Sequence, residues 1–206
     1  MPITEVKVLR SEDMDLIRML KADKVLSDIK PEHFKTDSGA VLIFCGDCDH
    51  ANDKWEHFRS LFQESGKIHR VFPATQAGGG IWIAKSELLQ KAGIALDEAL
   101  FFSIDAAFKH KGMTSVFPLV HAPCGAAGDF NLSLFDQLEL LVKGKERLKE
   151  KYSAVENLEV KGFFHLCLPG KRRRMYFVSA AIWNQNREKY RQFDYTPDRL
   201  FSVAAS

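Results

Sequence analysis

The sequence has no long hydrophobic run and contains little cysteine. No stretch of its 206 residues approaches the roughly 18 uninterrupted apolar residues that a membrane-spanning helix needs. Residues 4–15 are mixed and charged, without the basic start and apolar centre of a secretory signal peptide. The four cysteines are therefore expected to be reduced thiols, free to act as ligands or nucleophiles. These absences predict a cytoplasmic protein with no membrane partner.

An excess of charge of one sign is also absent. The 29 Lys and Arg residues nearly balance the 27 Asp and Glu residues, which leaves a formal net charge of +2. This balance gives no electrostatic reason to expect a nucleic-acid partner. The one basic run, Lys171 to Arg174, follows Pro169-Gly170 between two strand-like segments, so we expect it to form a solvated hairpin turn.

Two common catalytic or binding motifs are missing as well. Gly78, Gly79 and Gly80 form neither a P-loop nor a dinucleotide-binding fingerprint at a strand-to-helix turn. No Gly-x-Ser-x-Gly elbow supports a Ser-His-Asp hydrolase. Three consecutive glycines instead indicate that the backbone comes close to a partner or a site, because glycine adopts conformations that other residues avoid.

The sequence does contain strand-like and helix-like segments in alternation. Its length suits one domain, residues 1–206, which we divide into an N-terminal helical arm (1–39) and a core (40–206). Apolar runs and alternating patterns predict strands at 40–44, 68–72, 116–120, 158–168 and 175–182. Helical spacing predicts helices at 11–29, 51–65, 86–92, 96–110 and 132–151. The predicted fold is α/β, with a mainly parallel central sheet flanked by helices and a C-terminal antiparallel edge segment.

Two short clusters of metal-binding residue types each follow a predicted strand. They are Cys45-Gly46-Asp47-Cys48 and His121-Ala122-Pro123-Cys124-Gly125. Because functional groups gather at the carboxyl ends of parallel strands, we expect the two clusters to meet at one sheet edge. Cys45, His121 and Cys124 would then form a three-ligand zinc site with a fourth position left for water. Zinc in such a site lowers the pKa of its bound water to about 7, which makes hydroxide available near neutral pH.

The first cluster leaves alternatives open. Asp47 can accept a hydrogen bond from the hydroxide, or it can occupy the fourth position and close the site. Cys48 offers a third thiolate, which would give a closed structural site. Cys45-x-x-Cys48 after a strand is also a thiol oxidoreductase pattern, although that interpretation leaves the His121 cluster unexplained. The other thiol and imidazole groups are expected to be packed or solvated: Cys167, His33, His50, His57, His69, His110 and His165.

At the two clusters the chain resembles the β-class carbonic anhydrases. That family pairs a Cys-x-Asp-x-Arg motif after its first strand with a His-x-x-Cys-Gly motif after a later one, and these fall on residues 45–49 and 121–125. Thr75-Gln76-Ala77-Gly78 stands where the family has Arg-Asn-Ala-Gly. The likeness covers roughly residues 40 to 180. It implies a β-carbonic anhydrase-like fold for the core.

The resemblance also implies a function and a site. The function is the zinc-dependent, reversible hydration of carbon dioxide to bicarbonate, so the partners are this small-molecule substrate and its product. The implied zinc ligands are Cys45, His121 and Cys124, and the implied catalytic residue is Asp47, which would orient the zinc-bound hydroxide. The family's site lies near a dimer interface, which implies a homodimer or a higher homo-oligomer.

The chain departs from the family pattern beside Asp47. Asp49 stands where the family has the arginine that pairs with this aspartate and holds it off the metal. An acidic neighbour cannot make that pair and would raise the pKa of Asp47. Thr75 replaces a second arginine, and the clusters lie further apart than is usual, which implies an inserted segment around residues 81–96. A catalytically inactive or structural zinc protein of the same fold is therefore the alternative prediction.

Overall fold

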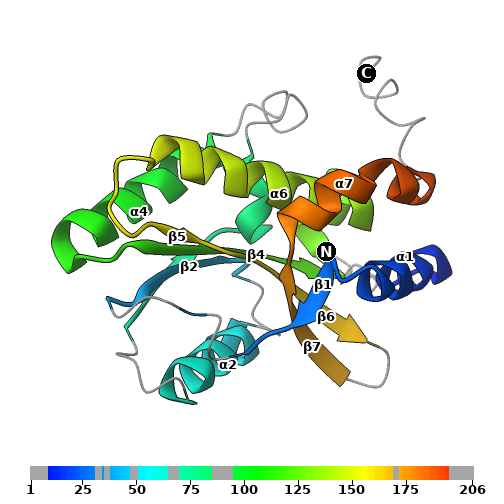
Figure 1. Cartoon of the computed structure of the whole chain (residues 1–206), viewed down its shortest axis with the longest axis horizontal. Coiled ribbons are helices and arrows are strands. Elements are labelled where there is room, and N and C mark those ends of the chain that lie inside the picture. Colours follow the sequence, from blue (N-terminus) through cyan, green and yellow to red (C-terminus); the bar gives the residue numbers. More distant parts are fainter. Residues whose placement is uncertain are drawn as a thin grey trace, which may run out of the picture.

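A seven-stranded sheet forms the centre of the computed structural model (Figure 1). The structure describes residues 9–30, 34, 38–46, 51–64, 70–84, 95–168 and 172–194. The strand order is β1-β7-β6-β4-β2-β3, and β5 pairs with β4 beside this path. The strands are β1 (Leu26–Asp28), β2 (Ala40–Phe44), β3 (Val71–Thr75), β4 (Ser115–Ala122), β5 (Glu159–Val160), β6 (Gly162–Leu168) and β7 (Arg172–Val178).

Most strand pairs are parallel, as predicted. β2 pairs in parallel with β3 and β4, and β4 pairs in parallel with β5 and β6. β7 is antiparallel to both β6 and β1. The α/β class, the mainly parallel sheet and the C-terminal antiparallel segment are thus confirmed. The sheet edge beyond β7 is occupied by β1, which the sequence pattern did not indicate.

Helices cover both faces of the sheet (Figure 1). α4 and α6 lie over one face, and α2 lies over the other. The helices are α1 (Ser11–Ala22), α2 (Ala51–Glu64), α4 (Leu96–Lys111), α5 (Gly125–Asp129), α6 (Leu134–Lys151) and α7 (Ala180–Tyr190), with 3₁₀ turns η2 (Gly79–Ile83) and η4 (Arg191–Phe193). No helix among the described residues is long and apolar enough to cross a membrane.

Side-chain alternation along the strands builds a separate core on each face. On one face Val116 and Val120 of β4 join a large aliphatic cluster with residues of α4 and α6. On the α2 face Phe117 packs against Phe58 and Phe163, with ring centroids 6.2 and 5.5 Å away. Because both faces of the central strands are covered, β2 and β4 are buried along their whole length. This burial explains why their sequences are continuous apolar runs.

Several predicted element boundaries are wrong: β3 ends at Thr75, three residues after the predicted strand end, and the strand predicted at 158–168 is divided into β5 and β6. The helix predicted at 11–29 ends at Ala22, and Leu26 belongs to β1, because Lys24 takes a left-handed conformation (φ 61°) that turns the chain toward the sheet. The strand predicted at 175–182 ends at Val178, and α7 begins after Ser179, whose side chain accepts a hydrogen bond from the Ile182 N–H.

The basic run is a further correction. Arg172, Arg173 and Arg174 were expected in a hairpin turn, but they lie in β7, where they pair with Leu168, Cys167 and Leu166 of β6. The antiparallel ladder already begins at Arg172, opposite Leu168, so the three arginines belong to the strand. The helix predicted at 86–92 lies outside the described residues.

Candidate metal centre

Cys45 is the first residue after β2, at the carboxyl end of the sheet. The β2–β3 pairing continues past the strand ends, because Gln76 N–H donates to Phe44 O and Gly46 N–H donates to Gln76 O, both at 3.3 Å. These bonds hold the backbone on each side of Cys45. Its thiol side chain therefore occupies a fixed place at the end of the strand.

His121 and Cys124 come from the neighbouring strand. His121 lies at the penultimate position of β4, and Cys124 is the N-cap residue of the short helix α5. Since β2 and β4 are parallel and adjacent, their carboxyl ends lie at the same edge of the sheet. This arrangement is the one predicted from the position of each cluster after an apolar strand.

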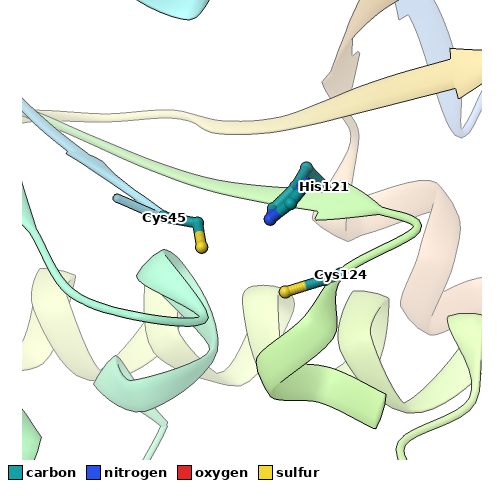
Figure 2. A group of neighbouring side chains, drawn as sticks. All are labelled: Cys45, His121 and Cys124. Carbon is teal, nitrogen blue, oxygen red and sulfur yellow. The ribbon is translucent and has the colours of Figure 1, made fainter. Parts of the chain in front are cut away.

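The three side chains point toward a common space (Figure 2). The Cys45 Sγ, a ring nitrogen of His121 and the Cys124 Sγ all lie within 4.8 Å of one another. The residues are 6%, 1% and 5% exposed, so the group is buried. The structure thus brings the three predicted ligand residues together, while their binding of a metal remains a prediction.

The glycine turn after β3 approaches this group closely. The Gly78 N–H donates to the Cys45 Sγ at 3.2 Å. Gly78 and Gly79 have φ angles of 86° and 58°, in the left-handed region that glycine allows. A Cβ on Gly79 would lie 2.4 Å from the backbone nitrogen of Cys45. The sequence analysis predicted a close backbone approach for these glycines, but it did not predict the hydrogen bond to the thiol.

The pKa values of the two thiols are shifted in opposite directions. A hydrogen bond with Cys124 lowers the pKa of Cys45 to about 3, and His121 and the Gly78 N–H act in the same direction. The same hydrogen bond, together with burial, raises the pKa of Cys124. A second negative charge beside the Cys45 thiolate is unfavourable in this buried setting. A divalent cation would reverse that balance, because metal binding displaces the remaining thiol proton.

The donor set fits zinc. Tetrahedral zinc, with bonds of about 2.3 Å to sulfur and about 2.0 Å to nitrogen, places its ligand atoms roughly 3.5–4 Å apart. The 4.8 Å limit of the group requires only small side-chain adjustments to reach this spacing. Two thiolates and an imidazole suit a borderline-soft cation and are poor ligands for magnesium or calcium.

No protein-family model matches the sequence, and no curated protein matches it. Among solved structures, the crystal structure of the β-carbonic anhydrase CafA of the fungal pathogen Aspergillus fumigatus matches with a TM-score of 0.36. The two chains are 16% identical, and the match covers 88% of each. A likeness this low assigns neither a family nor a function.

The predicted catalytic residue, Asp47, lies outside the described residues, and so do Cys48, Asp49 and His50. The catalytic role of Asp47 therefore stays a prediction. Among the remaining candidates, His33 and His69 also lie outside the described residues, whereas His57 and His110 lie on α2 and α4.

His165 lies closer to the site than the sequence suggests. It pairs with His121 in the β4–β6 register, and its Nδ1 is 3.8 Å from the Sγ of Cys167. Neither His165 nor Cys167 belongs to the three-residue group. Only the register of β6 on β4 shows this proximity, because the two histidines lie 44 residues apart in the chain and no local signal indicates that they pair.

Proposed function

We propose that the chain binds one zinc ion through Cys45, His121 and Cys124 and catalyses the reversible hydration of carbon dioxide to bicarbonate. The observation that carries the proposal is the convergence of two buried thiols and one imidazole at the carboxyl ends of adjacent parallel strands. The motif resemblance at residues 45–47 and 121–125 supports the choice of reaction. This activity would make the protein a lyase of the carbonate dehydratase type.

Zinc held by Cys45, His121 and Cys124 would supply hydroxide near neutral pH, because zinc in a three-ligand site lowers the pKa of a bound water to about 7. The chain's own residues prepare the site for this chemistry. The Gly78 N–H stabilises negative charge on Cys45. Ala127 and Leu132 pack beside Cys45 and Cys124, which gives the thiols an apolar wall. That wall suits a small uncharged substrate and strengthens electrostatic interactions inside the site.

Asp47 completes the proposal as the orienting residue. Its carboxylate would accept a hydrogen bond from the attacking oxygen and so fix the direction of attack. This role rests on the motif alone. The cytoplasmic location, the homodimer or higher homo-oligomer and the division at residue 40 likewise remain predictions.

Two measurements on the purified protein test the proposal. Elemental analysis should find one zinc per chain, and stopped-flow assay should show carbon dioxide hydration well above buffer, rising with pH around neutrality. Stoichiometric zinc without hydration would favour the structural zinc protein, and absence of zinc would remove both functions.

The variant Cys48→Ser then identifies the fourth position: zinc loss would indicate a closed site that uses Cys48. Reversible oxidation of a Cys45–Cys48 pair in metal-free protein would support the thiol oxidoreductase instead.

A further inference from the structure

One peptide group connects a buried tryptophan to Cys45. The Ala77–Gly78 peptide accepts a hydrogen bond from the Trp82 Nε1–H at its carbonyl oxygen. Its N–H, on Gly78, donates to the Cys45 Sγ at 3.2 Å. The indole, the peptide and the thiol thus form a continuous chain of two hydrogen bonds that ends on a proposed zinc ligand.

The surrounding structure fixes this chain in place. Trp82 is 4% exposed, and its ring packs edge-to-face against Phe130 with a centroid distance of 5.2 Å. The Gly79 N–H donates to Gln76 O at 2.8 Å, which closes the turn on the other side of the peptide. A Cβ on Gly78 would lie 2.8 Å from the Trp82 Nε1, so the glycine lets the indole reach the carbonyl.

We propose that Trp82 is a positioning residue that tunes the metal centre through the Ala77–Gly78 peptide; this inference rests on the proposed zinc site. Hydrogen bonds in series polarise one another, so a donor on the carbonyl strengthens the N–H bond to the sulfur. A stronger N–H bond withdraws electron density from the Cys45 thiolate. Hydrogen bonds that a metal ligand receives from the surrounding protein orient that ligand and set its donor strength.

Cobalt(II) substitution tests the proposal, because the energy of the thiolate-to-cobalt absorption band reports donation by sulfur. Trp82→Phe removes the indole N–H and keeps an aromatic ring. We expect its band to move to longer wavelength, because the Cys45 sulfur then donates more electron density. We expect its zinc dissociation constant to rise about tenfold, because the Ala77–Gly78 peptide no longer holds the thiolate in its orientation. Trp183→Phe is the matched control, because Trp183 is also buried and its Nε1–H donates to a side chain, Glu139 Oε2, at 2.9 Å. The control should leave both the band and the zinc affinity unchanged.

The outcomes separate this inference from the proposed function. No thiolate band in the wild-type protein would overturn the metal site, and the tuning role with it. A wild-type band that Trp82→Phe leaves in place, or that Trp183→Phe shifts equally, would overturn the tuning role alone.

A measurement on the wild-type protein tests the proposal even if Trp82→Phe does not fold. In wild-type protein loaded with an NMR-active cadmium isotope, the Gly78 amide proton should couple to the metal through the Cys45 Sγ, and absence of that coupling would overturn the proposal.

Discussion

Two regions of this molecule use a buried tryptophan in different ways. At the edge of the sheet, the Trp82 indole donates to a backbone carbonyl, and the same peptide donates to the Cys45 thiol. Between α6 and α7, the Trp183 indole donates directly to the Glu139 carboxylate at 2.9 Å. The first arrangement directs a dipole at a soft, reactive atom. The second satisfies a permanent charge.

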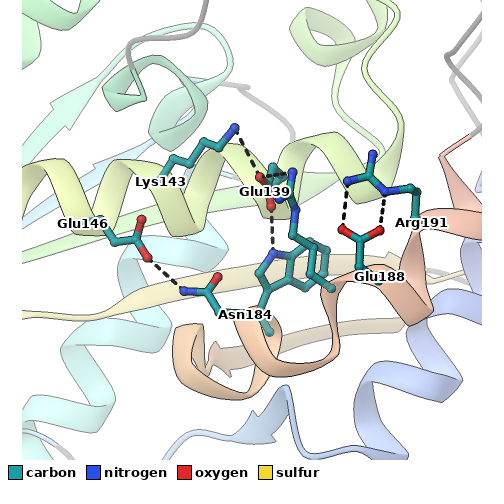
Figure 3. A network of polar contacts seen from close by, with 8 residues as sticks. Glu139, Lys143, Glu146, Asn184, Glu188 and Arg191 are labelled. Atoms are coloured by element: carbon teal, nitrogen blue, oxygen red, sulfur yellow. Dashed lines mark hydrogen bonds and ion pairs between the residues drawn. The ribbon is translucent and has the colours of Figure 1, made fainter.

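The α6–α7 region is a network of opposite charges (Figure 3). Glu139 also pairs with Arg187 Nη2 at 2.8 Å and with Lys143 Nζ at 3.2 Å. Nearby, Asn184 donates to Glu146 at 3.0 Å. The bonds of Trp183, Arg187 and Asn184 link α7 to α6, and Lys143 pairs with Glu139 within α6, so each of the two α6 carboxylates has a donor of its own. The sheet edge, by contrast, concentrates two thiols and an imidazole that a cation would complete. The contrast predicts that changes at the edge affect metal and activity, whereas changes between the helices affect stability.

The largest effect is expected from removing a proposed ligand. Cys124→Ser should abolish stoichiometric zinc and lower carbon dioxide hydration by at least about a hundredfold, because only two of the three soft ligands remain. Zinc content and stopped-flow rates measure this. Cys167→Ser is the control, since Cys167 lies on β6 outside the three-residue group and should retain both. Full zinc occupancy in Cys124→Ser would break the assignment of this edge as the metal site.

The next largest effect concerns the glycine turn. In Gly79→Ala the new Cβ would meet the backbone at 2.4 Å from Cys45 N and 2.7 Å from Phe44 C, with φ at 58°. We expect a loss of about 3–5 kcal/mol in the free energy of unfolding, measured by urea denaturation. Gly112→Ala is a matched control: its φ is 62° and nothing lies within 4 Å, so only the left-handed strain of about 1 kcal/mol should remain. Equal losses in the two variants would show that the turn is not packed tightly on the site.

A pH effect is expected from Lys145 of α6, whose Nζ donates to Val178 O at 2.9 Å. Burial, together with the nearby charges of Lys149 and Lys161, lowers the pKa of Lys145 to about 8, while Glu146 acts in the opposite direction. The unfolded chain, with a lysine pKa of about 10.4, therefore binds more protons between about pH 8 and 10. Lys145 should therefore add up to about 2 kcal/mol to the free energy of unfolding across this range, while the raised pKa of Cys124 acts in the opposite direction in both proteins compared below.

Lys145→Met provides the reference for that measurement. Urea denaturation of both proteins at pH 8 and pH 10 should show a change in the free energy of unfolding that is more positive in the wild type than in the variant, by up to about 2 kcal/mol. The same slope in both proteins would mean that Lys145 is not the group that titrates.

The smallest effect is expected within the charge network. Glu139→Ala leaves Trp183 and Arg187 without their shared acceptor, which should cost about 1–2 kcal/mol in the free energy of unfolding. Zinc content should be unchanged. Glu188→Ala is the control, because the Glu188–Arg191 pair at 2.8 Å is exposed and such pairs contribute little to stability. A loss of zinc in Glu139→Ala would erase the distinction between the two regions.

Local patterns were sufficient for the central strands and the long helices. β2 spans residues 40–44 as predicted, and α4 and α6 begin within two residues of their predicted starts. The prediction failed where the apolar pattern of one element continued into the start of the next element. Val25 and Leu26 extended the apolar spacing of α1, but they are buried beside and in β1. Residues 180–182 extended the alternation of β7, but they begin α7.

The candidate site shows the same division. The sequence alone predicted which three side chains would meet, because thiols and an imidazole that closely follow apolar runs are expected at the carboxyl edge of a parallel sheet. Only the tertiary structure decided that Gly78 donates to Cys45, that Trp82 supports that peptide, and that His165 lies beside His121. The physical reason is that the hydrophobic periodicity of a segment depends on which of its own residues are buried. Strand register and turn geometry depend instead on contacts between segments that lie far apart in the chain.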